Sequence, residues 1–310
     1  MAAAVIAAVS LATGCAGQTQ AQRAAEGSHA AESEAQAPPL PTRPYLSRRH
    51  AHETILTTEG PAPGTWPETW SETRTPRQVS RVTFMSGELE LQAWVGTPYG
   101  GGNHNSPALL YLHGDFAFGP DDFEVVRPFV DAGFVVMTPM LRGENGNPGD
   151  FELLWGEVDD ARAAVHWLSR HTMVDRQRIY VFGHSIGGGI AAMLSLYPGL
   201  PVQATASCGG IYVPETFARW ATSEQNRELI RFDAQDPSEI QLRVLGPNLP
   251  WMVHRHLAYV GEDDPWFLDN AAQLAAEAWR LGKPFERVTV PGDHMGSLQP
   301  ALEAFVHVTQ

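Results

Sequence analysis

The sequence predicts an α/β protein with a mainly parallel, doubly wound sheet and helices on both faces. From residue 79 onward, apolar runs of strand length alternate with segments of helical period, and short connections join them. The run PALLYLHG, residues 107–114, is continuously apolar, which is typical of a strand buried on both faces. With 310 residues and 43% hydrophobic composition, the chain is long enough for one large domain.

The order of the elements begins with a hairpin. Strands over 79–84 and 89–95 meet at Ser86-Gly87, which is a turn signal. Further strands are expected over 107–114, 134–139, 178–183, 202–207, 255–261 and 285–292. Helices are expected over 123–133, 156–170 and 270–281. Ligands of such sheets bind outside the carboxyl ends of the strands, so the residues that follow each strand are the candidates for function.

Composition and charge exclude several classes of partner. The formal net charge is −14 and no basic patch recurs, which argues against a nucleic-acid partner. The two cysteines, Cys15 and Cys208, form no disulfide framework and no zinc-type spacing. The pairs His50/His52 and His254/His256 have no third ligand cluster beside them. We therefore expect no metal and no cofactor.

The first fifteen residues, MAAAVIAAVSLATGC, predict a targeting segment. They form an apolar stretch that is too short to span a bilayer and ends in small residues. Leu11-Ala12-Thr13-Gly14-Cys15 resembles the lipobox of bacterial lipoproteins, although no Lys or Arg precedes the apolar run and Ala12 stands where leucine is commoner. The resemblance implies a lipid on Cys15 that anchors the protein in the bacterial cell envelope. A plain secretory peptide, giving a soluble periplasmic or secreted protein, is the alternative.

The next two segments have compositions that differ from that of the domain. Residues 16–40 are rich in Ala, Gln, Glu and Ser, so we expect a disordered tether. Residues 41–78 are rich in Pro, Thr and Arg and contain Trp66 and Trp70, so we expect an extended arm lying on the domain. The catalytic domain is expected over 79–308.

A dense group of glycines surrounds Ser185. Gly183-His184-Ser185-Ile186-Gly187 follows an expected strand and precedes an apolar, helix-like run. Gly-x-Ser-x-Gly in that position predicts a nucleophile elbow, a strained turn that exposes the serine hydroxyl. A helix N-cap serine and a flexible loop are the alternatives. A phosphate cradle is disfavoured because the Gly-x-x-x-x-Gly-Lys-Ser/Thr pattern is absent.

An acid and a histidine follow two later strands. Asp264 comes after the strand over 255–261, and His294 comes after the strand over 285–292. The chain order Ser, Asp, His is the one that belongs to this elbow. A serine hydroxyl needs a base to take its proton, and the base needs a carboxylate to hold its tautomer. The three residues therefore predict acyl transfer to water by Ser185, His294 and Asp264.

Residues 79–306 resemble an α/β-hydrolase domain, in particular that of the prolyl oligopeptidase family and of the related dienelactone-hydrolase-like esterases. The motifs are LHGD, PMLRGENGNPG, VDRQRIYVFGHSIGG and GEDDPWF, the last selecting Asp264 over Asp263. The family often uses a tyrosine hydroxyl in the oxyanion hole, where this chain has His113, and its peptidases usually have tyrosine where this chain has Ile186. The resemblance implies an oxyanion hole formed by the backbone N–H groups of Ile186 and Asp115. The carboxylate of Asp115 would then have to point away, and Arg142 is a candidate partner for it.

The resemblance also implies where the substrate binds. Hydrolases of this fold insert a cap in the region of 210–255, so Tyr212, Trp220, Trp251 and, on the acid loop, Trp266 are pocket candidates. Each of these aromatic residues has the alternative of packing the cap onto the sheet. Arg142 either binds a substrate carboxylate or pins the 113–116 loop. His184 is expected to support the triad, His113 to pack at its strand end and Cys208 to be buried.

Two classes of function remain open. The first is a serine hydrolase acting on a short peptide or amide, or on a small ester as a carboxylesterase, and we expect no propeller domain beside it. The second is a catalytically silent lipoprotein that uses the same cleft to bind a ligand. The intact set of serine, acid and histidine favours the enzyme, because a binding protein has no use for a strained serine.

Overall fold

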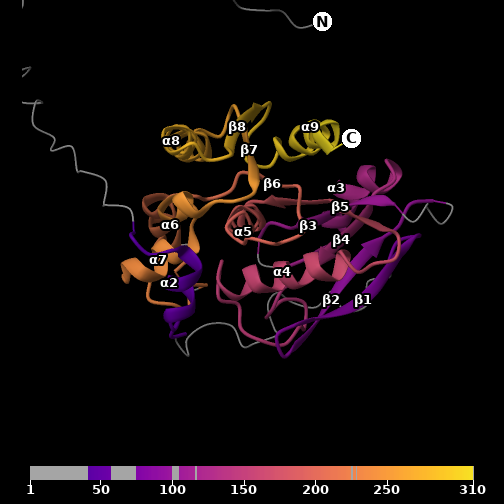
Figure 1. The fold of residues 1–310 in the computed structure, drawn as a ribbon, viewed down its shortest axis with the longest axis horizontal. Helices are drawn as coiled ribbons and strands as arrows, with labels where there is room; N and C mark the ends of the chain where they lie inside the picture. The colour runs from indigo at the N-terminus through magenta and orange to yellow at the C-terminus, as the bar shows by residue number, and fades with distance from the viewer. Residues whose placement is uncertain are drawn as a thin grey trace, which may run out of the picture. The chain divides into compact units, whose positions relative to one another are not determined.

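Eight strands form one sheet in the described part of the chain (Figure 1). The computed structural model describes residues 41–56, 75–99, 105–115, 117–224, 226–227 and 229–309. The expected targeting segment 1–15 with Cys15, the expected tether 16–40, and Trp66 and Trp70 lie outside these residues. The strand order is β1-β2-β4-β3-β5-β6-β7-β8.

The strands agree with the predicted runs within two residues at each end, except that β5 begins at Val174 rather than at 178. They are β1 (Val79–Ser86), β2 (Leu89–Gly96), β3 (Ser106–Leu112), β4 (Val135–Pro139), β5 (Val174–His184), β6 (Ala204–Cys208), β7 (Arg255–Gly261) and β8 (Phe285–Val290). Strand β2 is antiparallel to both β1 and β4, and every other pairing is parallel. The predicted fold class, a mainly parallel sheet with helices on both faces, is confirmed.

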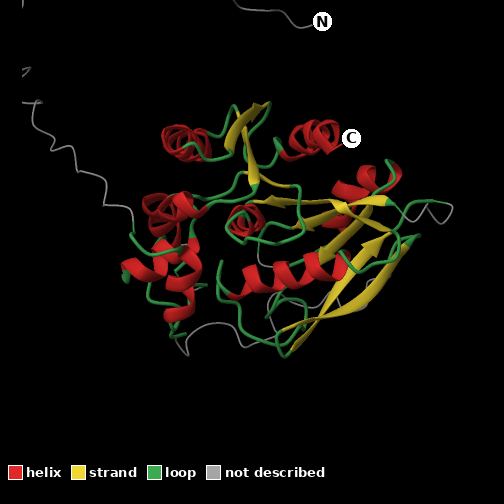
Figure 2. Ribbon diagram, viewed as in Figure 1, coloured by secondary structure: helices red, strands yellow, loops and turns green. Residues whose placement is uncertain are grey.

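Helices cover both faces of the sheet, as Figure 2 shows. They are α2 (Tyr45–Ala51), α3 (Pro120–Asp131), α4 (Gly156–Leu168), α5 (Ile186–Leu194), α6 (Pro214–Ala221), α7 (Pro237–Arg243), α8 (Pro265–Leu281) and α9 (Leu298–Thr309), with a short 3₁₀ helix η1 (Gly246–Trp251). One cluster of buried apolar side chains joins α3 and α9 to the sheet. A second cluster joins α4, α5 and α8 to it. The two clusters are the two covered faces that a doubly wound sheet requires.

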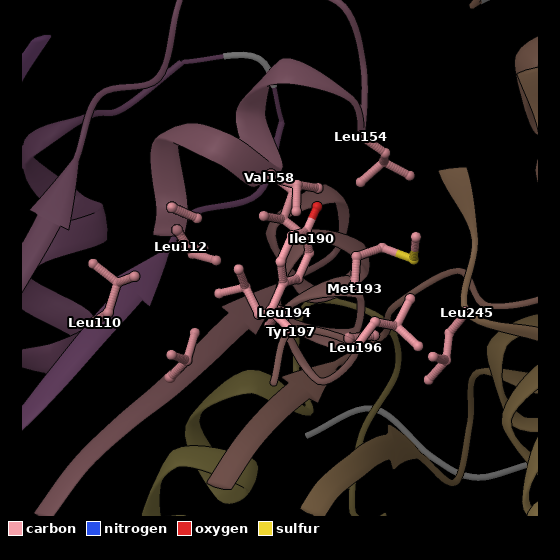
Figure 3. Packing of buried hydrophobic residues seen from close by; sticks show 14 of the residues in the cluster. Leu110, Leu112, Leu154, Val158, Ile190, Met193, Leu194, Leu196, Tyr197 and Leu245 are labelled. Carbon is pink, nitrogen blue, oxygen red and sulfur yellow. The ribbon is translucent and has the colours of Figure 1, made fainter. Parts of the chain in front are cut away.

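Helix α5, which follows Ser185, is apolar on all sides and is enclosed by its neighbours. Ile190, Met193 and Leu194 are fully buried, and they meet Leu110 of β3 and Val158 of α4 in Figure 3. A helix that is apolar all round is stable only in such an interior position. The element that follows Ser185 is therefore firmly held.

One predicted helix start and one predicted conformation differ from the structure. Helix α8 begins at Pro265 rather than at 270, because Pro265 and the residues after it continue the helix directly from the acid loop. The arm expected to be extended over 41–78 contains helix α2, whose Tyr45 is fully buried. Helix α2 lies beside α7 (Figure 1). A single buried aromatic in a seven-residue helix leaves no periodic signal in the sequence.

The parallel strands bring the ends of five strands to one edge of the sheet. In the register, Leu112 of β3 pairs with Gly183 of β5, and His184 pairs with Cys208 of β6. Farther along the same edge, Cys208 pairs with Tyr259 of β7, and Gly261 pairs with Val290 of β8. The residues that follow these strands therefore emerge side by side.

Candidate active site

Ser185 lies on a strained turn between β5 and α5. It has φ 51° and ψ −115°, a conformation that L residues rarely adopt. The flanking glycines allow the turn, because a Cβ atom on Gly183 would overlap the carbonyl oxygen of Gly187. A Cβ atom on Gly187 would in turn overlap the carbonyl oxygens of Leu112 and His113. The glycine-rich motif is thus required by the close approach of strand and helix.

His294 connects the serine to the acid. Its Nε2 lies 3.2 Å from Ser185 Oγ, and its Nδ1 lies 3.0 Å from Asp264 Oδ2. Asp264 is buried, whereas the neighbouring Asp263 is exposed. The side chain of His294 is 30% exposed. The imidazole therefore contacts both solvent and the serine hydroxyl, while the carboxylate of Asp264 is largely shielded from solvent.

Three further residues hold the imidazole of His294 in place. The ring of Phe267 stacks on it with centroids 4.4 Å apart. A Cβ atom on Gly209 would lie 2.6 Å from its Cε1, so only glycine fits there. His184 Nε2 donates to the carbonyl oxygen of His294 at 3.2 Å, and burial lowers the pKa of His184 to about 4. His184 is therefore a neutral support for the loop that carries His294.

The two backbone donors expected for an oxyanion lie beside Ser185 in the chain or in space. Ile186 is the first residue of α5, where helical N–H groups have no partner within the helix. Asp115 has a positive φ of 55° and follows Gly114, whose Cβ position lies 3.3 Å from Ser185 Cβ. Within the described part of the chain, no residue accepts a hydrogen bond from the backbone N–H of Ile186 or of Asp115.

Cys208 belongs to the support beneath the serine. Its carbonyl oxygen accepts the N–H of Ser185 at 2.9 Å, and its thiol is buried 3.3 Å from Ser297 Oγ. Burial raises the pKa of Cys208 to about 11, so the thiol stays protonated. The prediction that Cys208 is buried is confirmed.

Arg142 does not lie where the sequence argument put it. Its guanidinium donates to both carboxylate oxygens of Asp160, at 2.9 and 2.7 Å, and to Glu152 at 3.1 Å. Asp160 is fully buried, so the pair fastens helix α4 to the loop after β4. The expected contact with Asp115 or with the 113–116 loop is wrong. Each of the three guanidinium nitrogens donates to one of these carboxylates, so the contacts of Arg142 give no support to the alternative that it binds a substrate carboxylate.

The aromatic pocket candidates divide into two groups. Tyr212 is a core residue: it is fully buried, its hydroxyl bonds Ser207, and its ring packs on His256 and Phe285. The prediction that Tyr212 lines a pocket is therefore wrong. The other three candidates, Trp220, Trp251 and Trp266, are partly exposed.

Each partly exposed tryptophan has a different environment. Trp220 stacks on Phe217 at 6.4 Å, and Arg48 lies over Trp251 at 5.4 Å, which ties η1 to helix α2. Trp266 is the second residue of α8, two residues after Asp264, and its ring packs against that of Phe267 with centroids 5.5 Å apart. Of the four, Trp266 is the one that adjoins the residues around His294.

Sequence reasoning missed several residues of this site. Phe267 and Gly209 contact His294, and Glu144 pairs with His113 behind Gly114. A signal existed for Gly209, which follows a strand directly, and for Phe267, which lies one helical turn after Asp264. For Glu144 there was no signal, because an acid in a polar loop is ordinarily solvated.

The described ranges contain no group of three or more His, Cys, Asp or Glu side chains arranged to hold a metal ion. In the same ranges, no helix combines the length and the apolar character needed to cross a membrane.

A protein-family model matches part of the chain. Residues 89–212 match the model of the peptidase S15 family, described as X-Pro dipeptidyl-peptidase. The chain is 29% identical over 135 residues to the uncharacterized peptidase YtmA of Bacillus subtilis, which covers 42% of this chain and 50% of that protein. The chain spans about half the length of the curated relatives it matches.

Solved structures share the fold. A puromycin-hydrolyzing peptidase of Mycobacterium tuberculosis superposes with a TM-score of 0.62 at 20% identity, covering 74% of this chain and 38% of that chain. The acylaminoacyl peptidase of Pyrococcus horikoshii gives 0.60 at 19% identity, covering 74% and 41%. The solved structures share the α/β-hydrolase fold with this chain, and the matched family and the curated relative are both described as peptidases.

Proposed function

We propose that this chain hydrolyses short peptides or small amides by acyl transfer through Ser185, His294 and Asp264. The observation that carries the proposal is the continuous hydrogen-bonded chain from Ser185 Oγ through the imidazole of His294 to Asp264 Oδ2. This chain of contacts starts at a strained serine, and strain of that kind is retained where it serves a reaction.

The mechanism follows from the atoms involved. Ser185 Oγ attacks the substrate carbonyl while His294 Nε2 takes its proton, and Asp264 holds the Nδ1–H and stabilises the imidazolium. The backbone N–H groups of Ile186 and Asp115 bind the oxyanion, and one such donor is typically worth about 3 kcal/mol in the transition state. His294 then protonates the leaving group. Water repeats the sequence on the acyl-enzyme and frees Ser185.

The choice of an amide substrate draws support from the relatives. The matched family is described as an X-Pro dipeptidyl-peptidase, and a structural neighbour is a puromycin-hydrolyzing peptidase. The alternative is a carboxylesterase, which the motif Gly-His-Ser-Ile-Gly-Gly favours because Ile186 replaces the tyrosine of the peptidases.

Turnover of paired substrates tests the proposal. We would measure kcat/KM on aminoacyl and prolyl p-nitroanilides beside p-nitrophenyl esters of increasing acyl length, with Ser185→Ala as the control. Anilide turnover that vanishes in the control supports the peptidase; turnover of esters alone favours the carboxylesterase. A protein that turns over neither class, yet binds them equally well with and without Ser185, would be the catalytically silent alternative.

We also propose that Cys15 carries lipid and anchors the protein in a bacterial envelope, on the strength of Leu11-Ala12-Thr13-Gly14-Cys15. Expressed in a bacterium, the protein should fractionate with membranes, and Cys15→Ser should release it. Cys208→Ala is the matched control, and it should leave the fractionation unchanged. Wild-type protein found free in the periplasm with its N-terminus cut elsewhere would favour the plain secretory peptide.

A further inference from the structure

His113 lies behind the oxyanion loop and forms an ion pair that the proposed mechanism does not use. We propose that the His113–Glu144 pair is a positioning device that fixes the direction of the Asp115 backbone N–H. The inference rests on the proposed function, because it concerns how one oxyanion donor is held.

The contacts of the ring define its protonation. Nε2 of His113 lies 3.1 Å from Glu144 Oε2, and Nδ1 lies 2.7 Å from the carbonyl oxygen of Gly114. A carboxylate and a carbonyl are both acceptors, so each ring nitrogen must carry a hydrogen. His113 is therefore an imidazolium. Burial alone would lower its pKa, but the charge and hydrogen bond of Glu144 raise the pKa of His113 to about 9.

The hydrogen bond to Gly114 fixes a peptide plane. The carbonyl of Gly114 and the N–H of Asp115 belong to the same peptide unit, and in a trans unit they point in opposite directions. When Nδ1–H of His113 holds the carbonyl, the N–H of Asp115 is turned away from the ring. The positive φ of Asp115, 55°, is a strained state that needs such a constraint.

Glu144 joins this peptide to the loop after β4. Its Oε2 also accepts the N–H of Leu141 at 2.8 Å, and the side chains of Glu144 and His113 are each 2% exposed. The other groups that face His113 are the ring of Phe118, with centroids 5.9 Å apart, and the carboxylate of Asp122. That carboxylate accepts the N–H of Gly119 at 2.7 Å. The pair is thus dry, hydrogen-bonded and fixed from both sides.

Replacement of Glu144 by Gln tests the inference with little change in shape. The amide cannot balance a buried imidazolium, so His113 becomes neutral and keeps only one ring N–H group. Leu141 N–H requires an acceptor at the position of Oε2, so the amide oxygen takes that position and accepts the Nε2–H of His113. The hydrogen that is lost is then the one on Nδ1, which frees the Gly114 carbonyl. We expect kcat on p-nitrophenyl butyrate to fall about tenfold to a hundredfold, with KM within about twofold, as for a weakened oxyanion donor. Glu239→Gln is the matched control, because Glu239 is also buried and paired, with Arg243, outside the residues that surround Ser185.

The control separates positioning from stability. Both variants should unfold more easily than wild type, but only Glu144→Gln should lose kcat. If wild type turns over the ester through Ser185 and both variants keep the kcat of wild type, the inference is refuted, while acyl transfer through Ser185, His294 and Asp264 is unaffected. If wild type has no turnover that depends on Ser185, the proposed function fails and the inference fails with it.

A measurement on the unmodified ring keeps the inference testable if Glu144→Gln does not fold. ¹⁵N NMR of the histidine-labelled protein should show His113 with both nitrogens protonated at pH 7 and still at pH 8. A single unprotonated nitrogen on His113 at pH 7 would overturn the inference, because one of the two hydrogen bonds would then lack its donor.

Discussion

Asp263 and Asp264 are neighbours in the chain with opposite environments. Asp264 is buried with Oδ2 at 3.0 Å from His294, while Asp263 is exposed. A shift of the loop after β7 by one residue would therefore place Asp263 rather than Asp264 beside His294. The same loop continues into α8 and brings Phe267 against the imidazole.

Asp264→Asn should reduce kcat by several orders of magnitude, about 10⁴, because an amide stabilises the wrong tautomer of His294. Steady-state kinetics on the best substrate would measure it. Asp263→Asn is the matched control and should stay within about twofold of wild type. A reversal of the two effects would mean that the carboxylate of Asp263 serves His294 in solution.

The His113–Glu144 pair gives a pH dependence of stability. The pKa of His113 is raised to about 9 from 6.5, so the folded state holds this proton more tightly than the unfolded chain does. The protonated His113 therefore stabilises the folded state fully below pH 6.5, and this stabilisation is lost as the pH rises through 9. The free energy of unfolding lost in this way is about 3 kcal/mol. Urea unfolding at pH 6 and at pH 10 measures it, and Glu144→Gln should remove most of the difference. An equal fall in wild type and variant would assign the loss to other groups.

At the scale of elements, the elbow depends on backbone contact between β5 and α5. Gly183→Ala places a Cβ atom against the Gly187 carbonyl, and backbone atoms at both sides cannot yield. We expect a loss of several kcal/mol or no soluble protein. Gly119→Ala is the control, because its Cβ would lie 3.6 Å from Asp122 Oδ2 and its φ of −117° is ordinary for any residue. Its free energy of unfolding, measured by thermal denaturation, should fall by about 1 kcal/mol at most. Similar melting temperatures for the two variants would contradict the close approach.

Elements that carry a local signal could be predicted from the sequence, and those that depend on distant partners could not. The buried strands are marked by continuous apolar runs, and the turn at Ser185 is marked by the closely spaced glycines of Gly183–Gly187. Arg142 and Tyr212 are of residue types that are common in binding sites. In the structure each is instead occupied by a partner from another element, Asp160 for Arg142 and Ser207 for Tyr212. The sequence alone does not show which two polar side chains, distant in the chain, will be buried against each other.

On the scale of the whole molecule, helix α2 joins segments far apart in the chain. Arg49 bonds Asp159 and the carbonyl of Trp155, each at 2.8 Å, and His52 Nε2 lies 2.9 Å from Glu239. Tyr45 is fully buried against Tyr197, with ring centroids 6.1 Å apart. Helix α2 and His52 after it are therefore part of the folded unit that carries the site.

Tyr45→Ala should lower the free energy of unfolding by about 3–5 kcal/mol, because a large buried ring leaves a cavity. Chemical denaturation measures the change. The matched control is Ile55→Ala, whose side chain is 78% exposed, and it should shift stability by less than about 0.5 kcal/mol. If Tyr45→Ala is as stable as Ile55→Ala, then α2 contributes nothing to the folded unit.

The central claim is that Ser185 is a nucleophile activated by His294. Its most direct test is covalent labelling with a fluorophosphonate, followed by mass-spectrometric mapping of the modified residue. The account predicts one phosphonylated residue, Ser185, labelling that is strongly slowed in His294→Ala, and none in Ser185→Ala. Labelling that persists in Ser185→Ala, or a wild-type protein that resists the probe, would contradict it.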